Sequence, residues 1–167
     1  MDCATIPECR PAKPNRPHGT PHGTKTILVV EDEAFVREAT CNLLEERGYH
    51  VLWAENAVTA KILFSWYATE VDLVLCDAVL PDGNGIVLGQ GFRQECPNLK
   101  LIFLSGYPLA NLEQQLQLSS GTAFIAKPYS WSTLMPIIGG IFSQNQCGGS
   151  LPGVVVDGFE DHARDLV

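Results

Sequence analysis

Polar residues follow several apolar stretches of this 167-residue chain, each at the point where the apolar stretch stops. They are Glu31, Asp32, Asp77, Ser105 and Lys127. Three carboxylates that meet in one place bind protons or a cation, because like charges repel. Carboxylate oxygens suit a hard ion such as Mg²⁺, which leaves a position for phosphate. A carboxylate can also accept a phosphoryl group, and a lysine and a hydroxyl nearby would stabilise that group during transfer.

The elements that must position these residues are five apolar runs, which predict β-strands separated by helical patterns. The runs cover residues 26–30, 50–54, 71–76, 99–104 and 123–126. Strands that alternate with helices predict an α/β fold, with a parallel five-stranded sheet and helices on both faces. The carboxyl ends of parallel strands meet at one edge, where ligands bind in such sheets. This edge would therefore collect the polar residues.

Asp77 by itself leaves two interpretations open. It ends a nearly continuous apolar run, as a buried strand would, and so it stands where a ligand site is expected. It also precedes the turn residues Pro81, Asp82 and Gly83, and aspartate is common in turns. The four polar strand ends taken together favour chemistry over turn capping.

The helical patterns predict which side chains are buried. After the first strand, the expected apolar stripe consists of Val36, Ala39 and Leu43. Asn56 is the predicted N-cap of the following helix, because its side-chain oxygen can accept a hydrogen bond from a free helical amide.

Two later helices contain residues that disfavour a helix. Gly89 would weaken the helix expected over residues 85–96. Pro136 lies in the last helix and cannot donate a hydrogen bond from a helix interior. With Ser130 as N-cap, Pro136 would lie too deep, whereas with Thr133 as N-cap it would fall in the first turn. We therefore predict Thr133 as the N-cap.

Composition excludes several classes of function. The net charge of −8, without any cluster of Lys and Arg, argues against nucleic-acid binding. No apolar run reaches membrane-spanning length, and the N-terminus lacks the features of a signal peptide, which predicts a cytoplasmic protein without a membrane partner. The six cysteines include no Cys-x-x-Cys pair, so we expect no zinc site and interpret Cys41 and Cys76 as core residues.

The chain is long enough for one well-buried domain, which we expect over residues 25–143. Five prolines among the first 24 residues predict a disordered, Pro-rich tail over 1–24. The apolar pattern fails from about Ser143, so residues 144–167 are predicted to form a flexible acidic tail. Val154–Val156 could alternatively pair with an edge of the sheet.

The polar residues and their flanking sequence resemble the receiver domain of two-component response regulators over residues 26–142. The resemblance rests on Glu31-Asp32, Asp77, Leu80-Pro81 with Asn84-Gly85, Ser105, and Lys127-Pro128. It implies a flavodoxin-like (βα)5 fold, doubly wound, with the strand order 2-1-3-4-5. The segments 104–107 and 127–129 are similar to receivers attached to hybrid sensor kinases.

The resemblance also implies a role for each site residue. Asp77 would accept a phosphoryl group from the phosphohistidine of a sensor kinase or a phosphotransfer protein. Ser105 and Lys127 would contact the phosphoryl oxygens. Phe124 would be either a switch residue that turns inward when Ser105 moves or an ordinary strand side chain. The groups that would hold Mg²⁺ are Glu31, Asp32, Asp77 and the backbone carbonyl of Val79.

The predicted function is therefore that of a phosphorelay signalling protein, which catalyses only its own phosphorylation and dephosphorylation. It would act by conformational change and by contact with a downstream protein partner. Receivers often form homodimers that involve the last helix, and Pro136 puts that mode in question here. The alternative is a non-phosphorylated pseudo-receiver that serves as a protein-binding module. A haloacid-dehalogenase-like phosphatase is disfavoured, because Val79 stands where that family has a second aspartate.

Overall fold

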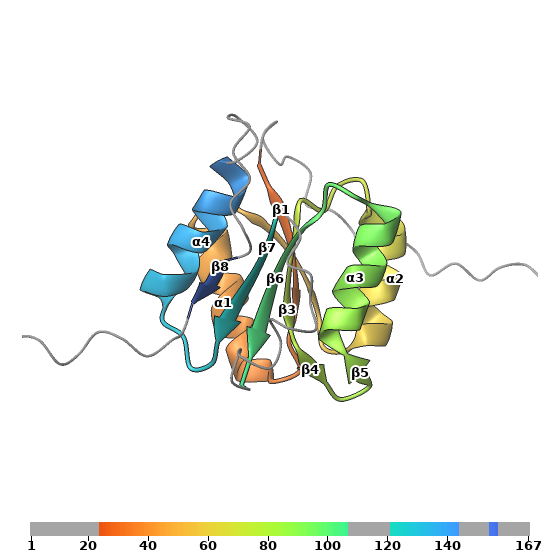
Figure 1. Ribbon diagram of the computed structural model, residues 1–167, viewed down its shortest axis with the longest axis horizontal. Coiled ribbons are helices and arrows are strands. Elements are labelled where there is room, and N and C mark those ends of the chain that lie inside the picture. The colour runs from red at the N-terminus through yellow and green to blue at the C-terminus, as the bar shows by residue number, and fades with distance from the viewer. Residues whose placement is uncertain (1–23, 107–120, 144–153, 157–167) are drawn as a thin grey trace, which may run out of the picture.

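The computed structural model describes residues 24–106, 121–143 and 154–156. Its main sheet has the strand order β2-β1-β3-β6-β7-β8, and all neighbouring strands are parallel (Figure 1). The strands are β1 (Thr26–Val30), β2 (His50–Ala54), β3 (Leu73–Asp77), β6 (Lys100–Ser105), β7 (Thr122–Ala126) and β8 (Val154–Val156). The first five confirm the predicted strands and their order. β8 pairs with β7 as a sixth strand, which is the edge pairing that the sequence left open.

The described helices cover both faces of the sheet (Figure 1). α1 (Ala34–Glu46) and α4 (Trp131–Ser143) pack on one face, whereas α2 (Ala57–Tyr67) and α3 (Gly85–Glu95) pack on the other. β1 and β3 are buried along their whole length, which explains why their sequences are nearly continuous apolar runs. Their carboxyl ends are therefore held by a core on each side.

The buried face of α1 differs from the predicted stripe. Thr40, Cys41 and Leu44 are buried, whereas Val36, Ala39 and Leu43 are only half-buried. The prediction was wrong by about one residue because it excluded a threonine from the core. Thr40 tolerates burial since its hydroxyl donates a hydrogen bond to the carbonyl of Val36 at 2.7 Å.

A short hairpin leads from the end of β3 into α3. Its strands are β4 (Val79–Leu80) and β5 (Gly83–Asn84), which pair antiparallel. The Asn84 side chain accepts hydrogen bonds from the amides of Ile86 and Val87, so it caps α3. The turn chemistry after Asp77 is thus confirmed as a hairpin followed by a capped helix.

The N-terminus of α2 is capped twice. The predicted N-cap, Asn56, is confirmed, because its side chain accepts a hydrogen bond from the Thr59 amide at 2.7 Å. Asp82, in the hairpin, accepts further bonds from the amides of Ala57 and Val58 at 2.8 and 2.9 Å. These backbone hydrogen bonds, that from Ala57 first, lower the pKa of Asp82. The hairpin after Asp77 is therefore attached to the start of α2.

Two glycines of α3 lie against β-strands. A Cβ atom on Gly85 would meet the carbonyl oxygen of Asp77 at 1.8 Å, and one on Gly89 would meet the ring of Phe103 at 2.8 Å. Gly89 was interpreted only as a residue that weakens the helix. The structure adds a packing reason, because neither position has room for a side chain.

The N-cap of the last helix is Ser130, and the prediction of Thr133 was wrong. The Ser130 hydroxyl accepts a hydrogen bond from the Thr133 amide at 3.2 Å, and α4 begins at Trp131. Pro136 therefore lies inside the helix, where proline costs about 3 kcal/mol. Burial of Leu134 and Ile138, each worth about 1.5–3 kcal/mol, offsets this cost.

Cys41 and Cys76 are buried core residues, as predicted. Burial raises the pKa of the Cys41 thiol to about 11 and that of Cys76 further. The only group of potential metal ligands within the described ranges consists of acidic residues and no cysteine. None of the described helices combines the length and apolarity needed to cross a membrane. Residues 1–23 of the predicted N-terminal tail lie outside the described residues, as do residues 107–120 and all of the predicted C-terminal tail except Val154–Val156. Cys3, Cys9 and Cys147 lie within these undescribed segments.

Candidate functional site

The four strands with polar ends finish at one edge of the sheet, the lower edge in Figure 1. The register pairs Val30 with Cys76, Asp77 with Leu104, and Ser105 with Ala126. The residues that follow these pairs therefore lie next to one another. The predicted site residues come together for this reason, although they are up to 96 positions apart in the sequence.

The carboxylates of Glu31, Asp32 and Asp77 form one acidic cluster. One oxygen from each lies within 4.8 Å of the others. Glu31 and Asp77 are buried, with 2% and 9% of their surface exposed, whereas Asp32 is exposed. Burial raises the pKa of Glu31, and the hydrogen bond from Lys127 opposes that rise. The cluster thus has one side open to solvent.

Lys127 binds two of these carboxylates. Its Nζ lies 2.6 Å from Asp77 Oδ2 and 2.8 Å from Glu31 Oε2. Burial disfavours its charge, but the bonds to Asp77 and Glu31 outweigh burial and raise the pKa of Lys127. Its backbone amide also donates to the Ser105 carbonyl at 2.7 Å, which places the lysine beside the end of β6.

The Asp77 carboxylate has a fixed orientation. Oδ1 accepts a hydrogen bond from the Val79 amide at 2.9 Å, while Oδ2 accepts from Lys127. The backbone amide of Ala78, the residue that follows Asp77, donates a hydrogen bond to the carbonyl oxygen of Leu104 on β6 at 2.8 Å. Asp77 therefore presents its oxygens from a backbone that is hydrogen-bonded to the neighbouring strand.

The donor set fits a hard divalent cation. Three carboxylates with one lysine leave an excess of two negative charges. All the ligand atoms are oxygens, which Mg²⁺ prefers, and the open side leaves space for water or phosphate. The Val79 backbone lies beside the cluster, but its carbonyl as a fourth ligand stays a prediction.

Ser105 and Phe124 have definite places near this cluster. Ser105 is buried at the end of β6. Phe124 is buried in β7, with its ring centroid 5.1 Å from that of Phe103 on β6. Phe124 thus already points into the core, and its role as a switch stays a prediction.

A model of the response regulator receiver domain family matches residues 27–138. The chain belongs to this receiver family. Sensor kinase CckA of Brucella abortus (strain 2308) is 36% identical over 112 residues, which are 67% of this chain and 12% of CckA. The response regulator receiver protein CpdR of the same strain is 29% identical over 105 residues, which are 63% of this chain and 86% of CpdR.

Solved receiver structures agree with this assignment. The receiver domain of hybrid histidine kinase CckA is 31% identical, with a TM-score of 0.60, and the match covers 70% of this chain and 97% of that one. TrrA from Thermotoga maritima, solved in complex with Mg²⁺ and BeF, is 27% identical with a TM-score of 0.60, covering 71% and 99%. The receiver therefore has the predicted flavodoxin-like fold and belongs to two-component signalling. The matches to the first three curated relatives cover 12%, 56% and 44% of the length of those proteins, so this chain corresponds to only part of each.

Sequence reasoning missed one residue that contacts the receiver's acidic loop. Arg37 Nη1 donates hydrogen bonds to the carbonyls of Glu31 and Asp32 at 2.7 and 3.1 Å. Its guanidinium carbon lies 4.9 Å from the ring centroid of Trp53. The available signal was an arginine in the first turn of the helix that directly follows the acidic pair.

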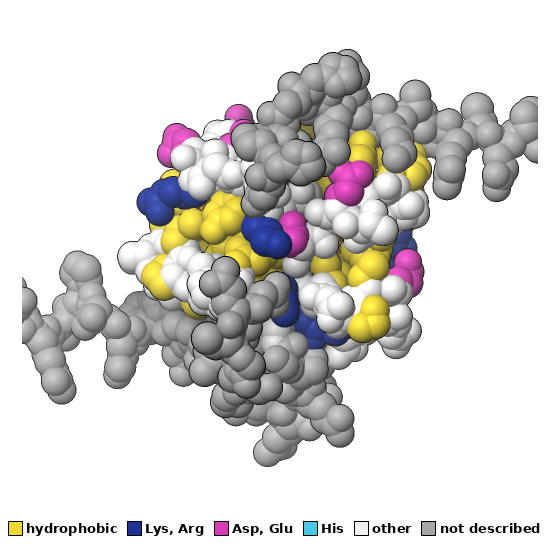
Figure 2. All heavy atoms as spheres, turned by 90° about the horizontal axis from the view of Figure 1, so that it is seen from above, with side chains coloured by type: hydrophobic (Ala, Val, Ile, Leu, Met, Phe, Trp, Pro, Cys, Tyr) yellow, Lys and Arg dark blue, Asp and Glu magenta, His cyan; other side chains and the backbone are white. Residues whose placement is uncertain are grey.

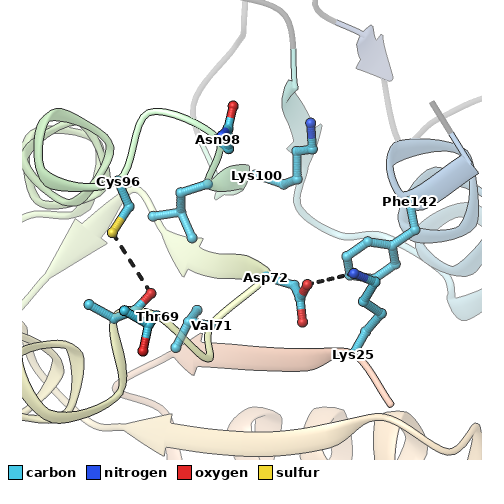
Figure 3. A pocket seen from close by; sticks show the side chains of 10 residues that line it. Lys25, Thr69, Val71, Asp72, Cys96, Asn98, Lys100 and Phe142 are labelled. Atoms are coloured by element: carbon cyan, nitrogen blue, oxygen red, sulfur yellow. Dashed lines mark hydrogen bonds and ion pairs between the residues drawn. The ribbon is translucent and has the colours of Figure 1, made fainter. Parts of the chain in front are cut away.

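A cavity of about 250 Å³ lies at the opposite edge of the receiver, where the strands begin (Figure 3). Its lining includes Lys25, Asp72, Cys96, Lys100 and Phe142. Figure 2 views this edge and shows a basic side chain beside an acidic one, with hydrophobic side chains to either side. The cavity is thus remote from the acidic cluster.

Proposed function

We propose that this receiver accepts a phosphoryl group on Asp77 from the phosphohistidine of a sensor kinase or phosphotransfer protein. The observation that carries the proposal is the buried Asp77 carboxylate, which lies in an acidic cluster with Lys127 Nζ at 2.6 Å. A carboxylate oxygen of Asp77 forms the new bond to phosphorus. The bond from phosphorus to the imidazole breaks, its electron pair returns to the ring nitrogen, and the imidazole takes up one proton.

The neighbours of Asp77 have complementary roles in this proposal. Lys127 moves from the carboxylate to a phosphoryl oxygen and offsets its charge, and the Ser105 hydroxyl donates to another. Glu31, Asp32, Asp77 and the Val79 carbonyl hold Mg²⁺. When bound, the ion supplies positive charge for the phosphoryl oxygens. Movement of Ser105 toward the phosphoryl group is then sensed by the neighbouring strand β7, which carries Phe124.

Exposed apolar side chains around the site support docking of a protein phosphodonor. Phe35 is 79% exposed near the start of α1, and Val58 and Val87 are exposed near the starts of α2 and α3. Val79, next to the acidic cluster, is also exposed. Helices that follow β-strands begin at the carboxyl edge, so these residues surround the cluster. In this proposal the phosphodonor covers these side chains when its phosphohistidine approaches Asp77.

In this proposal residues 25–143 form the receiver, and residues 1–24 and 144–167, apart from β8, are tails. The receiver is a signalling module whose output is contact with a downstream protein partner. A homodimer is a further proposed state.

The proposal is tested by intact mass of the full chain after incubation with acetyl phosphate, with and without Mg²⁺. We expect one phosphoryl group, incorporated only with Mg²⁺. Reduction with borohydride, followed by peptide mapping, should mark residue 77 as the site. Asp77→Asn should abolish incorporation, and the matched variant Asp72→Asn, at the other end of β3, should retain it.

Two outcomes would contradict the proposal. Incorporation that persists in Asp77→Asn would place the acceptor elsewhere. No incorporation from either acetyl phosphate or a phosphorylated histidine phosphotransfer protein would favour the pseudo-receiver alternative, a binding module without phosphorylation.

A further inference from the structure

Arg37 connects two residues of the acidic cluster through their backbones. It lies in the first turn of α1, and its Nη1 atom donates to the carbonyl oxygens of Glu31 and Asp32 at 2.7 and 3.1 Å. The carboxylates of the same two residues belong to the cluster. One side-chain nitrogen thus spans the loop between β1 and α1.

In this loop the hydrogen bonds between neighbouring strands end. The Glu31 amide still donates to Ala54 on β2 at 3.1 Å, which extends the pairing of β1 and β2 by one step. Asp32 lies one residue further on and is exposed. A loop residue needs another support if its carboxylate is to keep one position, and partners beyond the direct ligands commonly give that support in metal sites.

The Arg37 guanidinium in turn lies over the ring of Trp53. The guanidinium carbon lies 4.9 Å from the centre of the indole ring, which is within the range of a cation–π contact. Trp53 is on β2, the edge strand, and is 53% exposed. A planar guanidinium that stacks on a ring has a fixed orientation, which a lysine ammonium would lack.

Two roles of Arg37 would have opposite effects on cation binding. Its positive charge lies close to the acidic cluster, and charge alone would weaken the binding of a second cation. Its hydrogen bonds order the loop that carries Glu31 and Asp32, and order would strengthen binding. Removal of Arg37 therefore tightens Mg²⁺ binding if charge dominates and weakens it if positioning dominates.

We propose that Arg37 and Trp53 form a positioning pair that sets the Glu31–Asp32 loop for divalent cation binding. The inference rests on the proposed function in assigning Mg²⁺ to the acidic cluster. It adds two residues that touch neither the ion nor the phosphoryl group.

The test is a calorimetric titration of the full chain with Mg²⁺ in the absence of a phosphodonor. Arg37→Ala should weaken Mg²⁺ binding roughly tenfold, as is typical for loss of a partner that orients a ligand. Arg37→Lys restores the charge without the planar stacking, and should recover little of the affinity. Arg47→Ala is the matched control, because Arg47 is exposed at the other end of α1 and its removal should leave binding unchanged.

A second variant and a second readout guard against general unfolding. Trp53→Ala keeps the charge of Arg37 and should weaken binding in the same direction, but less. Hydrogen exchange of the Mg²⁺-free chain should show faster exchange over residues 31–33 in both variants, with the core strands unchanged.

Equal or tighter Mg²⁺ binding in Arg37→Ala would overturn the positioning role and leave the proposed function intact. Full recovery of affinity in Arg37→Lys would also overturn it, because charge alone would then suffice. A wild-type chain that binds no Mg²⁺ would instead refute the cation site itself, and this inference with it.

Discussion

Strand β3 has an aspartate at each end, and each aspartate pairs with a lysine at 2.6 Å. Asp72 precedes the strand and pairs with Lys25 at the amino edge (Figure 3), while Asp77 ends it and pairs with Lys127. The side chains at the amino edge are more exposed, 42% for Lys25 and 30% for Asp72. At the carboxyl edge, the side chain of Lys127 is 25% exposed and that of Asp77 is 12% exposed.

The two ion pairs have the same length but differ in the balance of charge around them. Asp72 Oδ1 binds Lys25 and Oδ2 accepts a hydrogen bond from the Thr26 amide at 2.9 Å, so the pair is neutral and joins β1 to β3. Lys127 forms ion pairs with both Asp77 and Glu31, so one positive charge is shared by two carboxylates. The carboxyl edge therefore keeps a surplus of negative charge, which is what a divalent cation requires. A short ion pair alone does not identify a site.

The largest effect is expected from a side chain placed beneath Asp77. Gly85→Ala would bring a Cβ atom within 1.8 Å of the Asp77 carbonyl oxygen, so the backbone of the carboxyl edge must move. We expect a loss of about 3 kcal/mol or more in the free energy of unfolding, measured by urea denaturation. Gly91→Ala, in the same helix with nothing nearby, should instead be neutral or stabilising. Similar results for both variants would disprove the close packing.

Removal of each lysine should distinguish the two ion pairs by function. Lys127→Ala should lower the rate of phosphoryl incorporation roughly a hundredfold, because a charged donor to the phosphoryl group is lost. Its Mg²⁺ affinity should be retained, since one competitor for the carboxylates is gone. Lys25→Ala should leave the incorporation rate unchanged. Equal loss of Mg²⁺ binding and phosphorylation in Lys127→Ala would show that Lys127 is mainly structural.

Mg²⁺ should stabilise the chain only through the carboxyl edge. At a concentration one hundred times its Kd, Mg²⁺ should raise the free energy of unfolding by about 2.7 kcal/mol, because it binds the folded state. Thermal unfolding with and without Mg²⁺ measures this increase. Asp77→Asn should reduce the increase and Asp72→Asn should not; an equal reduction in both would indicate non-specific binding.

The smallest effect is expected at the amino edge. Lys25→Ala removes a pair that is partly exposed, and such pairs contribute about 0–1 kcal/mol. Urea denaturation at low and high salt should show this small loss mainly at low salt, because salt screens exposed charges. A loss of several kcal/mol would mean that the balanced pair is as important as the unbalanced one.

Strand positions and the acidic cluster could be predicted because both follow from local signals. Apolar runs mark the strands, and parallel pairing brings their polar ends together. Glu31, Asp77 and Lys127 lie where that reasoning puts them. The roles in phosphorylation came from the resemblance to receivers and await the tests above.

Features that depend on contacts between distant segments could not be predicted. Asp82 caps a helix that begins 25 residues before it in the chain, and Gly89 is required by a ring on β6. The N-cap at Ser130 was missed because the cost of Pro136 was judged without the burial of the helix that contains it. Arg37 was missed because its hydrogen bonds to the acidic loop are accepted by backbone carbonyls, and its position directly after the acidic pair was not used as a signal.

The β4–β5 hairpin has a consequence for the lengths that this segment of the chain can have. Surface loops usually accept insertions and deletions. Here Asp82 must reach the first amides of α2 while Gly85 lies against the Asp77 carbonyl. One residue more or fewer between Asp77 and Gly85 would break one of these contacts. Contacts at both ends of the segment therefore fix the number of residues between Asp77 and Gly85. Among related sequences, we expect this segment to differ by substitutions and not by insertions or deletions.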